Sequence, residues 1–177
     1  MSKPEKWLVV GIPILFLVGG FLHFAYGLAG NNVLIGMIAP VNESVFEHMK
    51  MVLPLVLWWS LYYVCNGVKY NINRDKWFWA CTVSLACSIL TIPTVAYTYR
   101  NAFGIESVVF DVFILLFAIA VGQMIGIHVY RYGKGVSFVT SLTIIALIVV
   151  MFVVFTFWPP HTPIFQDDNT GEYGRKI

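Results

Sequence analysis

Long apolar stretches alternate with short polar segments along most of the chain. The first stretch runs from Trp7 to Ala29, and the later ones cover residues 44–65, 77–97, 107–130 and 137–158. A bilayer core about 30 Å thick needs about 20 helical residues to cross it, and every stretch is of this order. The pattern therefore predicts an all-α integral membrane fold, with a single domain over residues 1–177 built as a bundle of about five transmembrane helices.

Three features modify this simple pattern. Val33–Ala39 is apolar but too short to cross a membrane, so we expect an interfacial or re-entrant piece that ends at Pro40. Pro54 lies inside the second predicted helix, where the missing backbone donor predicts a kink. Gly122 and Gly126 have the GxxxG spacing in the fourth predicted helix, which indicates close packing against another helix.

Composition supports the membrane class. Hydrophobic residues make up 59% of the chain, charged residues only 11%, and the mean hydropathy is +0.78, whereas soluble domains have about 25% charged residues. The net charge is +2 and no run of Lys or Arg is present, so nucleic acid is not expected as a partner. The three cysteines include no Cys-x-x-Cys pair, and we interpret them as small buried hydrophobic residues.

Basic residues are distributed unevenly between the two sides of the predicted bundle. Seven lie on the side of the amino end and of the second and fourth loops: Lys3, Lys6, Lys69, Arg74, Lys76, Arg131 and Lys134. Three lie on the other side, in the third loop and the tail: Arg100, Arg175 and Lys176. The positive-inside rule then predicts a cytoplasmic amino end and an external tail over residues 159–177. Most other ionisable groups are thereby placed at the outer leaflet.

The densest group of polar residues is the block Pro40–Lys50, at the start of the second predicted helix. It reads Pro-Val-Asn-Glu-Ser-Val-Phe-Glu-His-Met-Lys. Either Asn42 or Ser44 is the predicted N-cap, and with Ser44 in that role Glu47 closes a capping box. Charged groups at this depth are costly, so they are expected to have partners or a function.

The spacing within this block allows a structural interpretation. Glu43, Glu47 and Lys50 are separated by four and three residues, so they share one helix face. Glu47 then caps the helix, Glu43 lies near the positive end of the helix dipole, and Lys50 pairs with Glu47. His48 lies about 100° around the helix from Glu47, so only one of the two faces the bundle.

The functional interpretation is a metal centre at the outer leaflet. Its predicted ligands are three histidines from separate segments, His23, His48 and His161. Zinc or iron is the expected cofactor, because such a site combines three nitrogen or oxygen ligands with an open position for water. Glu43 or Glu47 is the predicted catalytic base.

The remaining candidates are assigned to the substrate. Lys50 and Arg100 would hold an anionic headgroup, and Asp111 completes this predicted binding set. A structural alternative pairs Asp111 with Lys50 or Arg100. His23 likewise has a structural alternative, a hydrogen bond to a carboxylate or carbonyl inside the bundle, and the tail around His161 is predicted to fold back as a lid over the outer cluster.

Two sequence blocks carry a resemblance. The block Pro40–Lys50 and the tail segment Pro-Pro-His-Thr-Pro-Ile-Phe at residues 159–165, followed by Gly-Glu-Tyr-Gly at 171–174, resemble an uncharacterised family of small bacterial multipass membrane proteins, a domain of unknown function. The resemblance extends over essentially the whole chain. It implies a location in a bacterial plasma membrane and no particular activity.

Three classes of function follow from these observations. The first is a metal-dependent hydrolase or transferase embedded in the membrane and acting on a lipid-like substrate. The second is a small proton-coupled transporter or channel, since interrupted helices of this kind line substrate sites. The third is a membrane sensor or assembly partner. The expected partners are the lipid bilayer and a lipid-like or small-molecule ligand, with a homo-oligomer as a further expectation.

Overall fold

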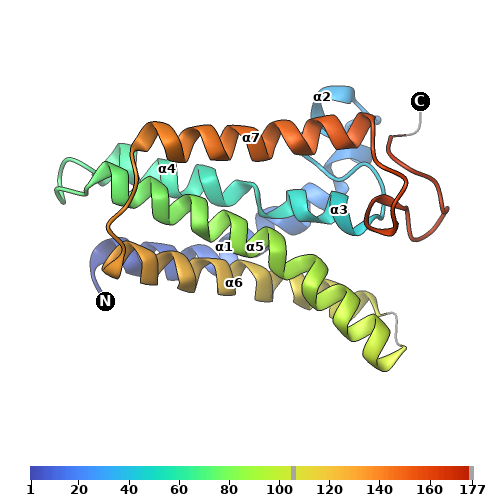
Figure 1. The fold of residues 1–177 in the computed structure, drawn as a ribbon, viewed down its shortest axis with the longest axis horizontal. Coiled ribbons are helices and arrows are strands. Elements are labelled where there is room, and N and C mark those ends of the chain that lie inside the picture. The colour runs from blue at the N-terminus through green and yellow to red at the C-terminus, as the bar shows by residue number, and fades with distance from the viewer. Residues whose placement is uncertain (105–106, 176–177) are drawn as a thin grey trace.

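The computed structural model describes residues 1–104 and 107–175, and its regular elements are all helices (Figure 1). In chain order they are α1 (Lys3–Leu28), α2 (Val33–Gly36), α3 (Val45–His48), η1 (Met49–Val52), α4 (Pro54–Asn66), α5 (Arg74–Phe103), α6 (Val108–Tyr132), α7 (Phe138–Phe157) and η2 (Pro163–Phe165). The described residues form no strand, so the predicted all-α class is confirmed. The last two residues of the predicted tail, Lys176 and Ile177, lie outside the described part.

Four helices are long and apolar enough to cross a membrane: α1, α5, α6 and α7. The second predicted helix, over 44–65, is divided into α3, η1 and α4. The division follows from Pro54, which has no amide hydrogen for a bond to the carbonyl of Lys50. That carbonyl instead accepts a bond from Leu53 N, at 2.9 Å, in the tighter helical geometry of η1.

Helix α5 extends further than the sequence predicts and carries Arg100 in its last turn, not in a loop. Asn73 begins the helix, since its side chain accepts a hydrogen bond from Lys76 N at 3.0 Å. No helix-breaking residue interrupts the chain after Tyr97, and the helix ends at Gly104, whose φ of 61° is readily adopted by glycine.

The closest helix packing is between α5 and α6, as the Gly122/Gly126 spacing predicts. A Cβ atom added to Gly122 would overlap Ser88 Oγ and would lie 2.5 Å from the backbone oxygen of Ser84. A Cβ atom at Gly126 would lie 2.8 Å from Ser84 Cβ. The two glycines therefore allow the backbones of α5 and α6 to approach closely.

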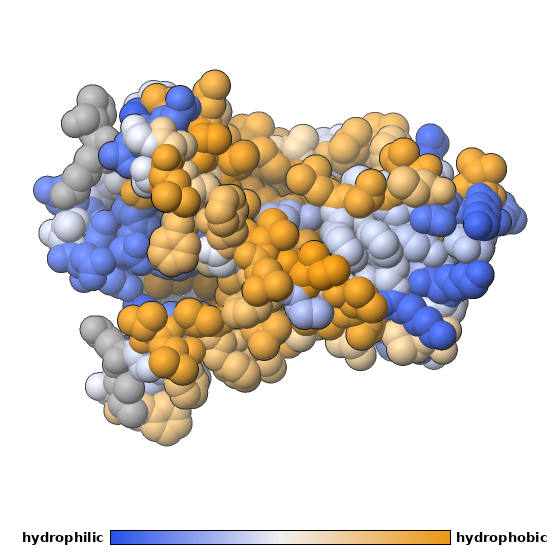
Figure 2. Space-filling model, turned by 180° about the vertical axis from the view of Figure 1, so that it is seen from behind, coloured by the Kyte–Doolittle hydropathy of each residue, from blue (hydrophilic) through white to orange (hydrophobic). Residues whose placement is uncertain are grey.

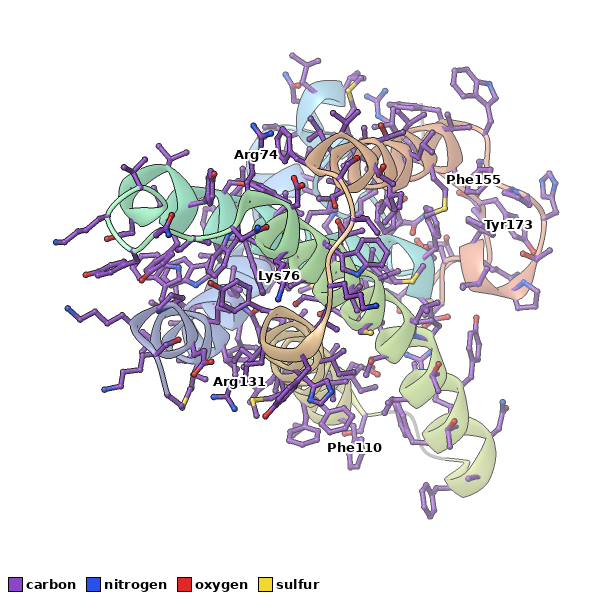
Figure 3. The ribbon with its side chains drawn as sticks, turned by 60° about the vertical axis from the view of Figure 1, so that its left-hand side comes forward. Arg74, Lys76, Phe110, Arg131, Phe155 and Tyr173 are labelled. Atoms are coloured by element: carbon purple, nitrogen blue, oxygen red, sulfur yellow. The ribbon has the colours of Figure 1, made fainter. Side chains whose placement is uncertain are left out.

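The two ends of the bundle differ in charge. Arg74, Lys76 and Arg131 lie at one end, and Phe155 and Tyr173 lie at the other (Figure 3). Figure 2 shows apolar side chains over much of the surface between them, with hydrophilic residues gathered at both ends. An exposed apolar surface of this extent is typical of a protein in contact with lipid.

One contact between the ends of two distant helices was not predicted from the sequence. The guanidinium of Arg131 donates two hydrogen bonds, both 2.6 Å long, to the carboxylate of Glu5. Glu5 is buried, and 126 residues separate the two partners along the chain. The pair fixes the beginning of α1 against the end of α6, next to the basic end of the bundle.

Candidate metal centre

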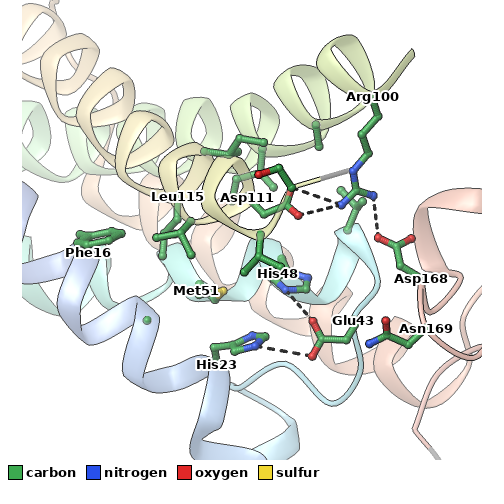
Figure 4. Close-up of a pocket in the computed structure, with 18 of the residues that line it drawn as sticks. Phe16, His23, Glu43, His48, Met51, Arg100, Asp111, Leu115, Asp168 and Asn169 are labelled. Carbon is green, nitrogen blue, oxygen red and sulfur yellow. Dashed lines mark hydrogen bonds and ion pairs between the residues drawn. The ribbon is translucent and has the colours of Figure 1, made fainter. Parts of the chain in front are cut away.

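A cavity of about 450 Å³ lies where α1, α3, the end of α5 and the beginning of α6 meet the tail (Figure 4). This volume is within the usual range of small-molecule sites, about 300–1,000 Å³. Most of its wall is apolar. The polar and charged residues of its lining are His23, Glu43, His48, Arg100, Ser107, Asp111, Asp168 and Asn169.

Three of these side chains converge on one point. His23 Nε2 lies 3.7 Å from Glu43 Oε1, and His48 Nε2 lies 3.4 Å from Glu43 Oε2. The two imidazole rings are stacked, with their centroids 5.2 Å apart. One ligand atom from each residue can be chosen so that all three lie within 4.8 Å of one another. Two imidazoles and a carboxylate at this separation could bind one metal ion.

Each candidate ligand comes from a different segment of the chain. His23 projects from the last part of α1, Glu43 lies in the turn between α2 and α3, and His48 is the last residue of α3. Ser44 caps α3, because its hydroxyl accepts a bond from Glu47 N at 3.3 Å. Asn42 Oδ1 accepts a bond from Ser44 N at 3.0 Å and fixes the turn that presents Glu43.

The hydrogen bonds of His48 determine which nitrogen faces the cluster. His48 Nδ1 lies 2.8 Å from the backbone oxygen of Ser44. Because a carbonyl oxygen can only accept, Nδ1 carries a hydrogen, and in the neutral ring the lone pair is on Nε2. A bond of this type to the second nitrogen is the usual support for a metal-bound histidine. His48 is therefore oriented with its ligand nitrogen toward Glu43.

The charge of the cavity favours a cation. When His48 is protonated it donates from Nε2 to Glu43, which lowers the pKa of the Glu43 carboxyl against the opposite effect of its partial burial, so Glu43 is ionised at neutral pH. Among the described residues, Asp111 and Asp168 bring two further carboxylates into the lining, and Arg100 brings a guanidinium. With both histidines neutral, as ligands of a metal ion must be, these described groups carry two net negative charges, which a divalent metal ion would balance.

Arg100 and Asp111 both line this cavity, as part of one polar network. Arg100 Nη1 donates to Asp168 Oδ2 at 2.7 Å, and Nη2 lies 3.4 Å from Asp111 Oδ2. The hydroxyl of Tyr99 donates to Asp111 Oδ1 at 2.7 Å. The predicted alternative, in which Asp111 pairs with Arg100, thus matches the geometry. Two carboxylates already surround the guanidinium, so its charge is largely compensated.

Glu47 and Lys50 lie apart from the cavity, in a separate buried pair. Lys50 Nζ donates to Glu47 Oε2 at 2.7 Å, and the side chains are only 0% and 2% exposed. Glu47 also accepts bonds from Val41 N at 3.0 Å and Thr156 Oγ1 at 2.9 Å, so its carboxylate does not close a capping box on Ser44. Neither residue lines the cavity, and their contact matches the predicted structural alternative in which Lys50 pairs with Glu47.

His161 is not brought to the cluster of His23, Glu43 and His48. It is exposed in the tail, where its ring contacts that of Tyr173 with 4.7 Å between centroids. Pro159 and Pro160 lie between α7 and His161. They direct the chain away from α7 before the tail returns toward the bundle. Glu43, predicted as a base, takes the third position among the candidate ligands instead.

The tail nevertheless folds back over the cavity, through residues other than His161. Asp168 and Asn169 line the cavity, and Asn42 Nδ2 donates to the backbone oxygen of Gly174 at 3.0 Å. Arg175 Nε donates to the hydroxyl of Tyr26 at 2.8 Å. The only signal for this arrangement in the sequence is a group of acidic residues in the short polar tail.

Comparison with known proteins gives a family but no activity. No curated protein and no solved structure matches the chain significantly. The model of a family described as "Family of unknown function (DUF6512)" matches residues 1–175. This match agrees with the resemblance noted in the sequence to an uncharacterised family. The chain therefore belongs to the DUF6512 family, a family of unknown function.

Proposed function

We propose that the protein is a metal-dependent enzyme embedded in the membrane, which hydrolyses or transfers a group of a lipid-like substrate. The observation that carries this proposal is the convergence of His23, Glu43 and His48 at the polar end of a largely apolar cavity. A polar reactive centre beside apolar walls suits an amphiphilic substrate. Zinc fits a set of two histidines and a carboxylate with an open position, and so does non-haem iron.

The proposed setting is a bacterial plasma membrane. We place the amino end in the cytoplasm and the tail outside, with α3, η1 and α4 together forming a fifth, interrupted crossing beside the four long helices. The basic end of the bundle supports this orientation through the positive-inside rule. The candidate metal centre is then at the outer leaflet, close to lipid headgroups.

The roles of the charged residues follow from their positions. A bound metal ion would lower the pKa of a coordinated water to about 7. Asp111 lines the same cavity and is the carboxylate that we assign to receive the proton, since Glu43 is occupied as a ligand and Glu47 is bonded to Lys50. Arg100, held by Asp111 and Asp168, is assigned to position Asp111 and to contact the polar group of the substrate.

Elemental analysis of the detergent-purified protein tests the proposed metal centre. We expect close to one zinc or iron ion per chain in the wild type and loss of most of it in His48→Ala and in His23→Ala, because each change removes one of three ligands. His161→Ala and His128→Ala are the controls. His161 lies outside the cluster and His128 contacts Tyr132 on α6, so both variants should retain the metal. A wild type without metal, or full retention in His48→Ala, would exclude the site.

The buried Glu47–Lys50 pair favours a second candidate, a proton-coupled transporter or channel. Lys50 lies within η1, and its Nζ also donates to the carbonyl oxygens of Gly36, the last residue of α2, and of Ala39. Interrupted helices with ionisable groups at membrane depth are found at transport sites. Proton flux into proteoliposomes that Glu47→Gln abolishes would support this function. Absence of both metal and flux would leave the predicted sensor or assembly partner.

A further inference from the structure

A second cavity, of about 440 Å³, adjoins the first between α1, the turn after α2 and the tail. His23, Phe24 and Glu43 line both cavities, so two of the three candidate ligands, His23 and Glu43, lie at the boundary between them. The lining specific to the second cavity is mostly polar or backbone: Tyr26, Gly27, Asn31, Pro40, Val41, Asn42, Asp167, Glu172 and Gly174. Gly27, Asn31 and Glu172 are exposed, which opens this cavity to solvent at the tail end of the molecule.

The lining of the first cavity is more apolar. Phe16, Met51 and Leu115 lie on one side of the histidines, away from Asp168 and Asn169 (Figure 4). Phe16 is seven residues before His23 on α1, which corresponds to about 10 Å along the helix. The apolar wall therefore extends from the candidate metal centre toward the middle of the bundle.

Part of the rim of the first cavity is also apolar. Phe24 on α1 is 63% exposed, and Val108 and Val112 on α6 are 79% and 50% exposed. These exposed side chains come from two helices that we place in contact with lipid, so the mouth between them faces the bilayer. A chain from a lipid-like molecule could enter here without crossing a polar surface.

We propose that the site has two separate entrances, one for an amphiphile and one for water. The alkyl chain of the amphiphile occupies the first cavity, with its polar group at His23, Glu43 and His48. Water, or a water-soluble co-substrate, reaches the same centre through the second cavity. This inference rests on the proposed metal-dependent function and specifies its substrate class as a molecule with at least one flexible apolar chain.

Two glycines on one face of α1 provide a matched test. Gly20 lines the first cavity and Gly27 lines the second, and a Cβ atom added to either would meet no heavy atom within 4 Å. They are seven residues, or about two helical turns, apart. Gly20→Leu and Gly27→Leu should therefore both fold, and each should narrow one cavity only.

The experiment uses the full chain loaded with Co²⁺ in phospholipid nanodiscs and two probes. The affinity for dodecanohydroxamate, a metal-binding amphiphile, is read from the visible spectrum of the bound Co²⁺. The rate of Co²⁺ removal by EDTA, which does not enter the lipid, reports on the aqueous route. We expect Gly20→Leu to weaken dodecanohydroxamate binding about tenfold, and Gly27→Leu to slow removal by EDTA about tenfold, with neither variant showing the other effect.

The outcomes separate this inference from the proposed function on which it rests. Equal effects of both variants on both probes, or no effect of either, in protein that holds Co²⁺ would overturn the two entrances and leave the metal centre standing. A wild type that takes up no Co²⁺ and contains no zinc or iron would overturn both. Acetohydroxamate, which has the same metal-binding group without the chain, should bind Gly20→Leu as well as the wild type.

Discussion

Lys50→Met should destabilise the folded protein by about 3–5 kcal/mol, the cost typical of removing one partner from a buried ion pair. Lys50 is 0% exposed and donates to Glu47 Oε2 at 2.7 Å and to the backbone oxygen of Gly36 at 2.9 Å. Methionine has a similar length, so the packing is largely retained while the charge is lost. Glu47 would be left as an uncompensated buried carboxylate. The measurement is the thermal unfolding midpoint in detergent.

A double variant separates the charge effect from a general loss of packing. Glu47→Gln together with Lys50→Met removes both charges, and it should recover part of the stability that Lys50→Met loses. Lys69→Met is the matched control, because Lys69 is exposed. Among the described residues, no carboxylate lies within ion-pair distance of it. A Lys50→Met protein as stable as Lys69→Met would contradict the buried pair.

Gly122→Leu should destabilise the bundle by about 3 kcal/mol, because a large side chain must enter a fully packed contact. The first added atom alone would overlap Ser88 Oγ and approach the backbone oxygen of Ser84 to 2.5 Å. A backbone atom cannot rotate out of the way as a side chain can, so α5 and α6 must separate. Unfolding in detergent, followed by circular dichroism, measures the effect.

Gly27→Leu is the control for the size of the substitution. It adds the same side chain to a helix at a position where a Cβ atom meets no heavy atom within 4 Å. Its expected stability is equal to or slightly above that of the wild type, since leucine has the higher helix propensity. If both variants lose the same stability, the loss comes from the added side chain itself and not from the α5–α6 contact.

The helices could be predicted because apolar length and helix-ending residues are local properties of the sequence. Helix α7, Phe138–Phe157, lies within one residue of the predicted 137–158. Where the structure differs from the prediction, the reason is also a local property of the sequence. Pro54 produces the separate η1 and α4, and the helix that carries Arg100 continues to Phe103.

The candidate site could be predicted only in part, because its geometry depends on contacts between distant segments. The sequence indicates that Glu47 and His48 point in different directions, but Thr156, 109 residues away from Glu47, is one of the partners that hold Glu47 inside. His23 and His48 were found through their polarity in apolar surroundings. Asp168 was not, since its bond to Arg100 spans 68 residues and has no local signal.

The folded-back tail has a consequence for biosynthesis. His23, Glu43 and His48 are all translated within the first 48 residues, whereas Asp168 and Arg175, which close the site, are translated near the end. At about 5–20 residues per second, the ribosome takes roughly ten seconds to cover the sequence between them. During that interval, the tail is not yet present to cover His23 and His48 in the nascent chain. If a metal ion binds at the proposed centre, its access is therefore least obstructed while the protein is still being synthesised.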